Sequence, residues 1–312
     1  MIRAETDRPR IGGLKGPGSR RMHVAQWVMG IDGGGTGCRA VLADGEGRVA
    51  GQADGGPANV MSDREGAVAS ILAVSLAALG GRDPADCVAC LGLAGAEVTD
   101  ANGWLPGRLP FARAVVVQDA RTALQGALGD VDGIVAAIGT GSVFMRRYQG
   151  EATVIGGRGP VLGDEASGAW CGKRLLSRTL RAHDGVERRT ALTDAVLNRM
   201  GGVGGVIAFA RTAGGAEFAA LARDIAGNAD DPAARDVLTE GEAHVSTYIA
   251  RLQPADQALP VAFTGGLGPV YAARLGGRWQ VRPPLGTPLD GALSLARGLL
   301  ARPALVEPGG RA

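Results

Sequence analysis

The chain has 312 residues, enough for two domains of ordinary size that each bury a core. Hydrophobic residues make up 46% and charged residues 21%, which excludes a largely disordered or coiled-coil protein. The formal net charge is +2, and residues 1–23 alone carry +4, so the rest is slightly acidic and no nucleic-acid partner is expected. No apolar run reaches the roughly 18 residues that a membrane span requires, so no membrane partner is expected either.

Residues 1–23 are basic and lack the apolar segment of a secretory signal, so we expect a disordered leader or residues upstream of a true start at Met22. Four cysteines without a paired pattern suit a reduced, cytoplasmic protein. Cys87 and Cys90 have the spacing of a metal knuckle, but no second pair exists and both lie in an apolar run. We therefore expect them to pack on opposite faces of a strand.

The first half of the chain predicts a three-stranded meander followed by helices and strands in alternation. Glycines at residues 33–37 join the first two strands, and residues 44–47 give a hairpin signal before the third. This order is typical of a mixed α/β layer domain, which we place at residues 24–130. The expected strands are 27–31, 38–43, 48–53, 87–93 and 114–118, and the expected helices are 66–79 and 120–128.

The pattern restarts near residue 130 with strand, glycine turn and strand, which indicates a duplicated pair of similar domains. The second domain is placed at residues 131–302, and its last helix is expected to pack back on the first domain. The expected elements are strands at 133–138, 143–148 and 260–264, helices between 166 and 252 and at 289–301, and a frayed tail at 303–312.

Two glycine-rich turns, residues 32–36 and 138–142, predict phosphate binding. A phosphate needs backbone N–H groups with no side chains in the way, and strand–glycine–strand turns supply them. Thr36 adds a hydroxyl donor to the first turn, and Thr140 and Ser142 add donors to the second. A Walker loop and a Rossmann fingerprint are both excluded, because no lysine follows the required glycines and a strand, not a helix, follows the turn.

Six motifs then carry a family resemblance. They are residues 28–36 (VMGIDGGGT), 56–59 (GPAN), 118–120 (QDA), 137–142 (AIGTGS), 156–168 (GGRGPVLGDEASG) and 264–267 (TGGL). In this order they resemble the motifs of N-acetylglucosamine kinases and bacterial glucosamine kinases, which are actin/hexokinase-like ATPases of the BadF/BadG/BcrA/BcrD type. The resemblance spans about Trp27 to Leu300. It implies two ribonuclease-H-like domains with mixed sheets flanked by helices, and ATP and sugar in the cleft between them.

The resemblance also implies roles for single residues. Asp119 looks like the catalytic base, and Asp32, at the end of its strand, looks like the Mg²⁺ carboxylate. The sugar-binding set is Asn59, Asp119, Thr140, Gly159 and Asp164. The nucleotide-binding set is Gly33, Gly34, Gly35, Thr36, Gly139, Thr140, Gly141, Ser142, Gly265, Gly266 and Leu267. Gln118 stands where the family usually has Asn, and Arg158 stands where many members have an aromatic residue. These departures leave the shape of the sugar pocket, and so the C2 substituent of the sugar, undetermined.

Both key carboxylates have a plainer interpretation. Asp119 precedes a predicted helix, and Asp164 precedes another, so each could be a helix cap.

The sequence therefore predicts a cytoplasmic, homodimeric kinase that uses ATP and Mg²⁺ to phosphorylate the 6-hydroxyl of an amino sugar, N-acetylglucosamine or glucosamine. One alternative is an activator ATPase of an acyl-CoA reductase or dehydratase, which holds an iron–sulfur cluster between subunits through exposed cysteines. The other is a non-catalytic sugar sensor, which the presence of Asp119 disfavours.

Overall fold

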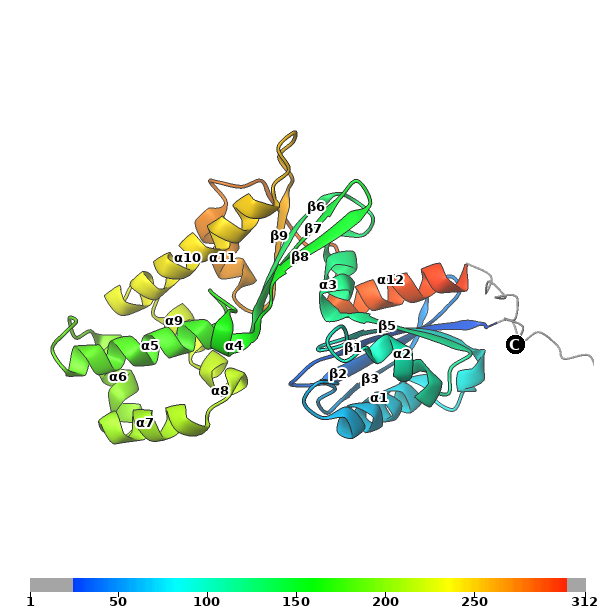
Figure 1. The fold of residues 1–312 in the computed structure, drawn as a ribbon, viewed down its shortest axis with the longest axis horizontal. Coiled ribbons are helices and arrows are strands. Elements are labelled where there is room, and N and C mark those ends of the chain that lie inside the picture. Colours follow the sequence, from blue (N-terminus) through cyan, green and yellow to red (C-terminus); the bar gives the residue numbers. More distant parts are fainter. Residues whose placement is uncertain (1–24, 302–312) are drawn as a thin grey trace, which may run out of the picture.

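The computed structural model describes residues 25–301, so the predicted leader at 1–23 and the predicted tail at 303–312 lie outside the described residues. Figure 1 shows two lobes, each built on one five-stranded sheet with helices packed against it. Both sheets mix parallel and antiparallel strands, which confirms the predicted α/β class.

The first sheet has the strand order β3-β2-β1-β4-β5. The first three strands form the expected antiparallel meander, and β4 and β5 continue from β1 in parallel. The carboxyl ends of the three parallel strands therefore meet at one edge, which faces the second lobe in Figure 1. The strands are β1 (Trp27–Gly33), β2 (Cys38–Asp44), β3 (Val49–Gly55), β4 (Cys87–Leu93) and β5 (Arg113–Gln118).

The second sheet, β8-β7-β6-β9-β10, repeats this arrangement strand for strand, with the same directions. The repeat that the sequence pattern indicates near residue 130 is thus visible in the topology. The sequence pattern did not identify β8, which is partly exposed and lacks a clear apolar alternation, or the two-residue β10. The strands are β6 (Gly133–Ile138), β7 (Ser142–Tyr148), β8 (Glu151–Gly156), β9 (Val261–Thr264) and β10 (Val281–Arg282).

The helical run expected from residue 166 to 252 is divided into six helices, α5 to α10. Ser167 and Asp231 cap α5 and α10 by accepting backbone N–H groups of the first turn. No helix among residues 25–301 is long and apolar enough to span a membrane. The helices are α1 (Arg64–Leu79), α2 (Ala101–Trp104), α3 (Asp119–Leu128), α4 (Gly159–Leu162), α5 (Gly168–His183), α6 (Ala191–Arg199), α7 (Gly202–Thr212), α8 (Gly215–Ala220), α9 (Ala222–Gly227), α10 (Pro232–Leu252), α11 (Gly268–Leu275) and α12 (Pro288–Leu300).

Helices α3 and α12 form a layer between the two sheets, as Figure 1 shows. α12 packs on β1 and β4 of the first sheet, around Val28 and Cys90, while α3 packs on β6 and β7 of the second, around Val135 and Met145. The outer face of the first sheet is covered by α1, and that of the second by α5, α10 and α11. Both connections of the chain between the lobes therefore run through one of these two helices.

The two middle helices touch through their backbones, and glycine makes this possible. A Cβ at Gly291 of α12 would overlap the Thr122 carbonyl oxygen of α3 and lie 2.5 Å from the Gly126 nitrogen. A Cβ at Gly30 of β1 would lie 2.5 Å from the Leu293 nitrogen of α12. No side chain larger than hydrogen fits at these positions without moving α12.

We expect Gly291→Ala to lower the free energy of unfolding by about 1–3 kcal/mol, because the added methyl overlaps backbone atoms of α3. Gly298→Ala is the matched control in the same helix, since nothing lies within 4 Å of its Cβ position. The control should leave stability unchanged or raise it by up to about 1 kcal/mol, because alanine favours the helix. Urea unfolding followed by circular dichroism measures both, and equal stability of Gly291→Ala and the parent protein would contradict a tight crossing.

Candidate active site

The first glycine-rich turn, residues 33–37, joins β1 to β2 at the edge that faces the second lobe. Two neighbouring loops hold it. The Gly33 carbonyl accepts the Ala94 amide and the Gly34 carbonyl accepts the Ala58 amide, each at 2.9 Å. The segments that follow β3 and β4 therefore fix the position of the turn.

The outer side of this turn is open. A Cβ at Gly34 or Gly35 would have no protein atom within 4 Å, and neither residue has a positive φ, so the fold itself requires glycine at neither position. Within residues 25–301, the amides of Gly35 and Thr36 donate no hydrogen bond. Open space beside free backbone donors is the environment that an anion requires.

The second turn, residues 139–142, rests on the N-terminus of α5. The Gly139 carbonyl accepts the Gly168 amide at 2.8 Å, and the Thr140 carbonyl accepts the Ala169 amide at 3.1 Å. The Cβ position of Gly139 is open, and the Thr140 side chain is exposed. The two halves of the molecule thus present similar open turns.

Ser142 differs from the other predicted hydroxyl donors. It is buried, and its hydroxyl donates to the Glu165 carbonyl at 2.8 Å. A serine hydroxyl has one proton to donate, so this side chain holds the turn against the following loop rather than offering a proton to a phosphate.

Asp164 braces the loop that carries α4. Its side chain accepts the Gly159 amide at 3.1 Å, and its other oxygen lies 2.7 Å from the Cβ position of Gly141 in the second turn. Asp164 is only 7% exposed and has a φ of 57°. Burial raises the pKa of this carboxyl. It does not cap α5, because Ser167 occupies that position.

The predicted adenosine segment lies beside the second turn. The Leu267 amide donates to the Ile138 carbonyl at 2.9 Å, and Gly265 has a φ of 81° with its Cβ position against the same carbonyl. The Cβ position of Gly266 is open. Residues 265–267 are therefore held against the end of β6.

Asp119 opens α3 directly after β5, at the same sheet edge as Asp32. The helix cap is Gln118, which makes no side-chain cap hydrogen bond, so Asp119 is not the cap. One of its oxygens, Oδ1, accepts the Ala120 amide at 2.8 Å, and within the described residues Oδ2 accepts none. Burial raises the pKa of Asp119, and the negative charge of Asp32 raises it further, so the two carboxylates lie close enough to interact.

Asn59 forms a tight turn with the residues that follow it. Its Oδ1 accepts the amides of Met61 and Ser62 at 2.9 and 3.3 Å. This fixes the side chain and leaves its NH₂ group as a donor, since among the described residues it has no hydrogen-bond partner. The turn also contacts the loop after β4, where a Cβ at Gly95 would lie 3.2 Å from Asn59 Oδ1.

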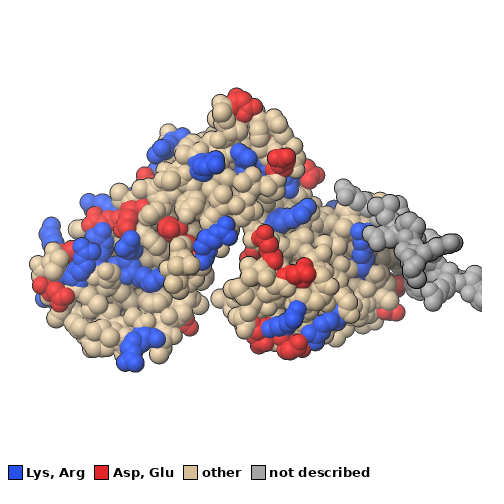
Figure 2. Space-filling model, in the orientation of Figure 1, with Lys and Arg blue, Asp and Glu red and all other residues tan. Residues whose placement is uncertain are grey.

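Figure 2 shows that the surface is hollowed between the two lobes, with acidic and basic side chains at the margins. A cavity of about 580 Å³ is lined by residues of both lobes, and Gln118, immediately before Asp119, is part of its wall, whereas none of the predicted site residues is. Both lobes line the cavity, with Ala96, Glu97, Asp100, Asn102, Val116, Val117, Gln118, Arg121 and Leu124 from the first and Gly150, Ala152 and Val154 from the second.

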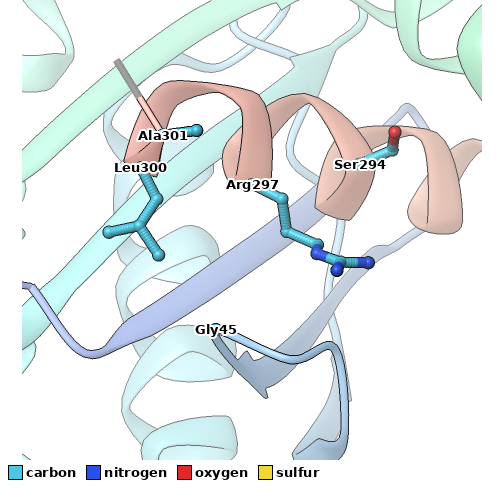
Figure 3. Close-up of a pocket in the computed structure, with 5 residues that line it drawn as sticks. All are labelled: Gly45, Ser294, Arg297, Leu300 and Ala301. Carbon is cyan, nitrogen blue, oxygen red and sulfur yellow. The ribbon is translucent and has the colours of Figure 1, made fainter. Parts of the chain in front are cut away.

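A second cavity, of about 370 Å³, lies at the other end of the strands, between the β2–β3 hairpin and the last turns of α12 (Figure 3). Gly45 is part of its wall. Gly45 follows Asp44, which pairs with Trp27, the first residue of β1. Arg297 is its one charged side chain, so it offers no acid–base pair.

No group of three or more His, Cys, Asp or Glu residues able to hold a metal is found within residues 25–301. The four cysteines are free and buried, and burial raises the pKa of the Cys87 and Cys90 thiols to about 12. Cys87 and Cys90 lie in different core clusters on opposite faces of β4, as expected. Asp32, the carboxylate predicted to hold Mg²⁺, lies at the end of β1 beside the open turn.

The sequence reasoning missed Arg39, which donates from Nη2 to Oδ2 of Asp32 at 2.7 Å. Asp32 and Arg39 are paired directly across β1 and β2. In an antiparallel hairpin, residues at equal distances from the turn lie opposite each other, so the position of the glycine turn would have predicted this pair. The sequence reasoning also missed Lys173, whose ammonium donates to the Pro160 carbonyl in the α4 segment.

Comparisons with known proteins identify relatives of this chain. The chain matches the model of the BadF/BadG/BcrA/BcrD ATPase family over residues 29–273. It is 34% identical to glucosamine kinase GspK of Vibrio cholerae over 72% of this chain and 80% of that protein. It is 30% identical to an N-acetylmuramic acid/N-acetylglucosamine kinase of Clostridium acetobutylicum over 55% of this chain and 60% of that protein.

Among solved structures, a candidate N-acetylglucosamine kinase from Chromobacterium violaceum superposes with a TM-score of 0.81 at 33% identity, covering 88% of this chain and 99% of that one. A glucokinase of the ROK family from Streptomyces griseus gives a TM-score of 0.52 at 20% identity, covering 88% and 98%. The second likeness concerns the fold alone.

The raised pKa of Asp119 predicts a pH-dependent effect of Asp119→Asn on stability. The folded state holds this proton more tightly than the unfolded state, so the stability that it contributes is present at low pH and lost as the pH rises through the folded-state pKa. Each unit of upward shift corresponds to about 1.4 kcal/mol. At about pH 7 the variant should therefore melt at or above the temperature of the parent protein, with a difference that shrinks on acidification.

Scanning calorimetry between about pH 4 and 8 measures this difference. A variant that melts lower at neutral pH would contradict the expectation and would mean that the carboxylate stabilises α3.

Proposed function

The chain belongs to the BadF/BadG/BcrA/BcrD ATPase family, and we propose that it is an ATP-dependent kinase that phosphorylates the 6-hydroxyl of an amino sugar. The observation that carries the proposal is Asp119, a largely buried carboxylate with a raised pKa and one free oxygen, at the sheet edge that also holds the open turn. A carboxylate in this position can accept a hydroxyl proton beside a bound phosphate.

The two turns are the proposed binding site for the phosphates of ATP. The free amides of the first turn and the open Gly139 of the second grip the phosphates from opposite lobes, and residues 265–267 contact the adenosine. The nucleotide-binding set predicted from the sequence remains part of the proposal, with Ser142 acting through its backbone.

Mg²⁺ is part of the same proposal. Asp32 lies at the end of β1 beside the open turn, and its negative charge adds to the effect of burial in raising the pKa of Asp119. One or two carboxylates with nucleotide oxygens are a usual ligand set for this ion, so the residues present fit it. When bound, Mg²⁺ neutralises charge on the phosphates.

The sugar is proposed to lie between Asn59, Asp119 and the loop that carries Gly159 and Asp164, with Thr140 at its phosphate side. The free NH₂ group of Asn59 and the free Oδ2 of Asp119 offer a donor and an acceptor to sugar hydroxyls. The relatives named for glucosamine and for N-acetylglucosamine support an amino sugar. Both sugars present the same 6-hydroxyl, so the proposed chemistry is common to them.

In the transfer step, Asp119 Oδ2 accepts the proton of the 6-hydroxyl as that oxygen attacks the γ-phosphorus. The bond between the γ-phosphorus and the β-phosphate oxygen breaks, and ADP leaves with the bonding electron pair. The protein's main contribution is to hold the two reactants in line and to exclude water as the lobes enclose them.

An activator ATPase is less well supported. A cluster shared between subunits needs cysteines at the surface, and all four cysteines of this chain are buried. A sugar sensor needs no proton acceptor, so the carboxylate at Asp119 argues for catalysis. The cytoplasmic location and the homodimer expected from the sequence remain part of the proposal.

The direct test is a coupled assay of ADP release with glucosamine and N-acetylglucosamine, each with ATP and Mg²⁺. We expect turnover with at least one of the sugars and a product that is the 6-phosphate by phosphorus NMR. Absence of turnover with both, by protein that binds ADP in calorimetry, would contradict the proposed kinase.

Asp119→Asn should lower kcat by about 10²–10⁴, because the amide keeps the shape and hydrogen bonding of the carboxylate but does not accept the hydroxyl proton. The KM for the sugar should change far less. Asp184→Asn, at the exposed end of α5, is the matched control and should leave kcat unchanged. A variant that keeps more than about a tenth of the parent kcat would remove Asp119 from the catalytic role.

A further inference from the structure

The short helix α4, residues 159–162, contains Gly159 and precedes Asp164, two residues of the proposed sugar site. It lies with α5 and α8 on the side of the second lobe that faces the first (Figure 1). Little of the helix is packed, since the side chains of Val161 and Leu162 are 89% and 85% exposed. A segment with so few buried apolar contacts needs another restraint to stay in one position.

The carbonyl group of Pro160 is where this restraint acts. α4 ends at Gly163, so the Pro160 carbonyl has no partner within the helix. Among residues 25–301, no backbone amide donates to this carbonyl. The Lys173 ammonium donates to it instead, as lysines often do at the last carbonyls of a helix. Within the same residues, this is the one side-chain hydrogen bond between α4 and another helix or strand, so Lys173 ties α4 to α5.

The surroundings of Lys173 connect this contact to the rest of the second lobe. The ammonium lies 5.8 Å from the centre of the Phe218 ring in α8, within the range of a cation–π contact. α8 also approaches α4, because a Cβ at Gly215 would lie 3.4 Å from Pro160 Cγ and 4.0 Å from Thr140 Cγ2. Lys173 therefore lies where α4, α5 and α8 meet beside the second turn.

The residue type at this position is unusual for the chain. Every basic residue except Lys15 and Lys173 is an arginine. An ammonium is a compact charge on a flexible stem, whereas a guanidinium is a planar fork that suits carboxylates and phosphates. A single carbonyl beside a half-buried side chain fits the ammonium better. The lysine therefore follows from the contact that it makes and not from the composition of the chain.

The positive charge of Lys173 also acts on the carboxyl group of Asp164. Burial raises the pKa of Asp164, and the negative charge of Glu165 raises it further. The charge of Lys173 lowers it, as do the backbone amides of Gly159 and Ser142. An ionised carboxylate accepts hydrogen bonds from sugar hydroxyls with both oxygens, so Lys173 favours the form of Asp164 that suits a sugar.

We propose that Lys173 is a positioning residue that holds α4, and with it Gly159 and Asp164, in the conformation that binds the sugar. The inference rests on the proposed function, which assigns these two residues to the sugar. Lys173 acts through the Pro160 carbonyl and does not contact the substrate. Without the ammonium α4 takes up other positions, and the affinity for the sugar falls with the fraction of molecules in which the helix is correctly placed.

The experiment measures kcat and KM for the amino sugar that the parent protein prefers, and the affinity for ADP by calorimetry, with the full chain. Lys173→Met keeps an unbranched apolar side chain but removes the ammonium. It should raise the KM for the sugar about tenfold, because the charge-assisted hydrogen bond that holds α4 is lost. The kcat should change far less, and the affinity for ADP should stay within about twofold of the parent value.

A chemical rescue tests the ammonium directly. Lys173→Cys should raise the sugar KM as Lys173→Met does, and 2-bromoethylamine then alkylates the introduced thiol, with loss of bromide, to give a close analogue of lysine. The four natural cysteines are buried with thiol pKa values raised to about 12, so they react slowly by comparison. The alkylated variant should return to within about threefold of the parent KM, and mass spectrometry checks that one group was added.

Arg174→Met is the matched control. Arg174 follows Lys173 in α5, but its Nη2 pairs with Oε1 of Glu240 in α10 at 2.8 Å, and its guanidinium lies over the Trp170 ring. Its replacement removes a positive charge from the same turn of α5 without affecting the Pro160 carbonyl. The sugar KM should therefore stay at the parent value. A melting curve of each variant measures its stability separately.

A sugar KM for Lys173→Met within about twofold of the parent value would overturn the proposal, even if the variant melts at a lower temperature, because Lys173 would then serve stability alone. Equal weakening of sugar and ADP binding would also overturn it, since the change would not be confined to the sugar loop. So would an alkylated Lys173→Cys variant that does not recover.

The parent protein separates this inference from the proposed function. If it phosphorylates an amino sugar while Lys173→Met keeps the parent KM, the proposed function stands and this inference fails. If the parent protein phosphorylates neither glucosamine nor N-acetylglucosamine, the proposed function fails and this inference fails with it.

Discussion

The crossing of α3 and α12 is the contact on which the rest of the structure depends. Both helices lie between the sheets, and they approach so closely that only glycine fits at Gly126 and Gly291. α3 begins with Asp119 at the edge of the first sheet and packs on the second sheet, while α12 returns from the second sheet to the first. Their crossing therefore sets the distance between the lobes and, with it, the position of Asp119 relative to the second turn.

The repeated topology gives the two turns the same backbone but different surroundings. The first turn has charged side chains beside it, Asp32 and Arg39, and free amides on its open side. The carbonyl groups of the second turn accept N–H groups from the start of α5. The Ser142 hydroxyl bonds to the following loop, and the Asp164 side chain packs against Gly141 of the turn. Duplication gives the two turns one backbone shape, whereas charged side chains flank the first turn and hydrogen bonds from neighbouring segments hold the second.

Two features of the candidate site are unfavourable for the stability of the folded protein. Burial raises the pKa of Asp119 and of Asp164, which means that each ionised carboxylate is less stable there than in water. Asp164 also adopts a left-handed backbone conformation that is unusual for a residue with a side chain. Such features are retained at functional sites, where the surrounding structure holds them.

The sequence by itself determined the three strands of the first meander and the first two strands of the second. It also determined the two glycine turns and the residues that end β1 and β5, because each depends on neighbours a few positions away. It also indicated the duplication, since a pattern that repeats along the chain needs no knowledge of contacts.

Only the tertiary structure decided how the side chains are used. It placed Gln118 rather than Asp119 at the helix cap, committed the Ser142 hydroxyl to Glu165, and turned Arg39 toward Asp32 rather than Asp54. It also revealed the glycine crossing of α3 and α12, whose partners lie more than 150 positions apart. These choices depend on strand register, helix position and the packing of distant segments, and none of them leaves a local pattern in the sequence.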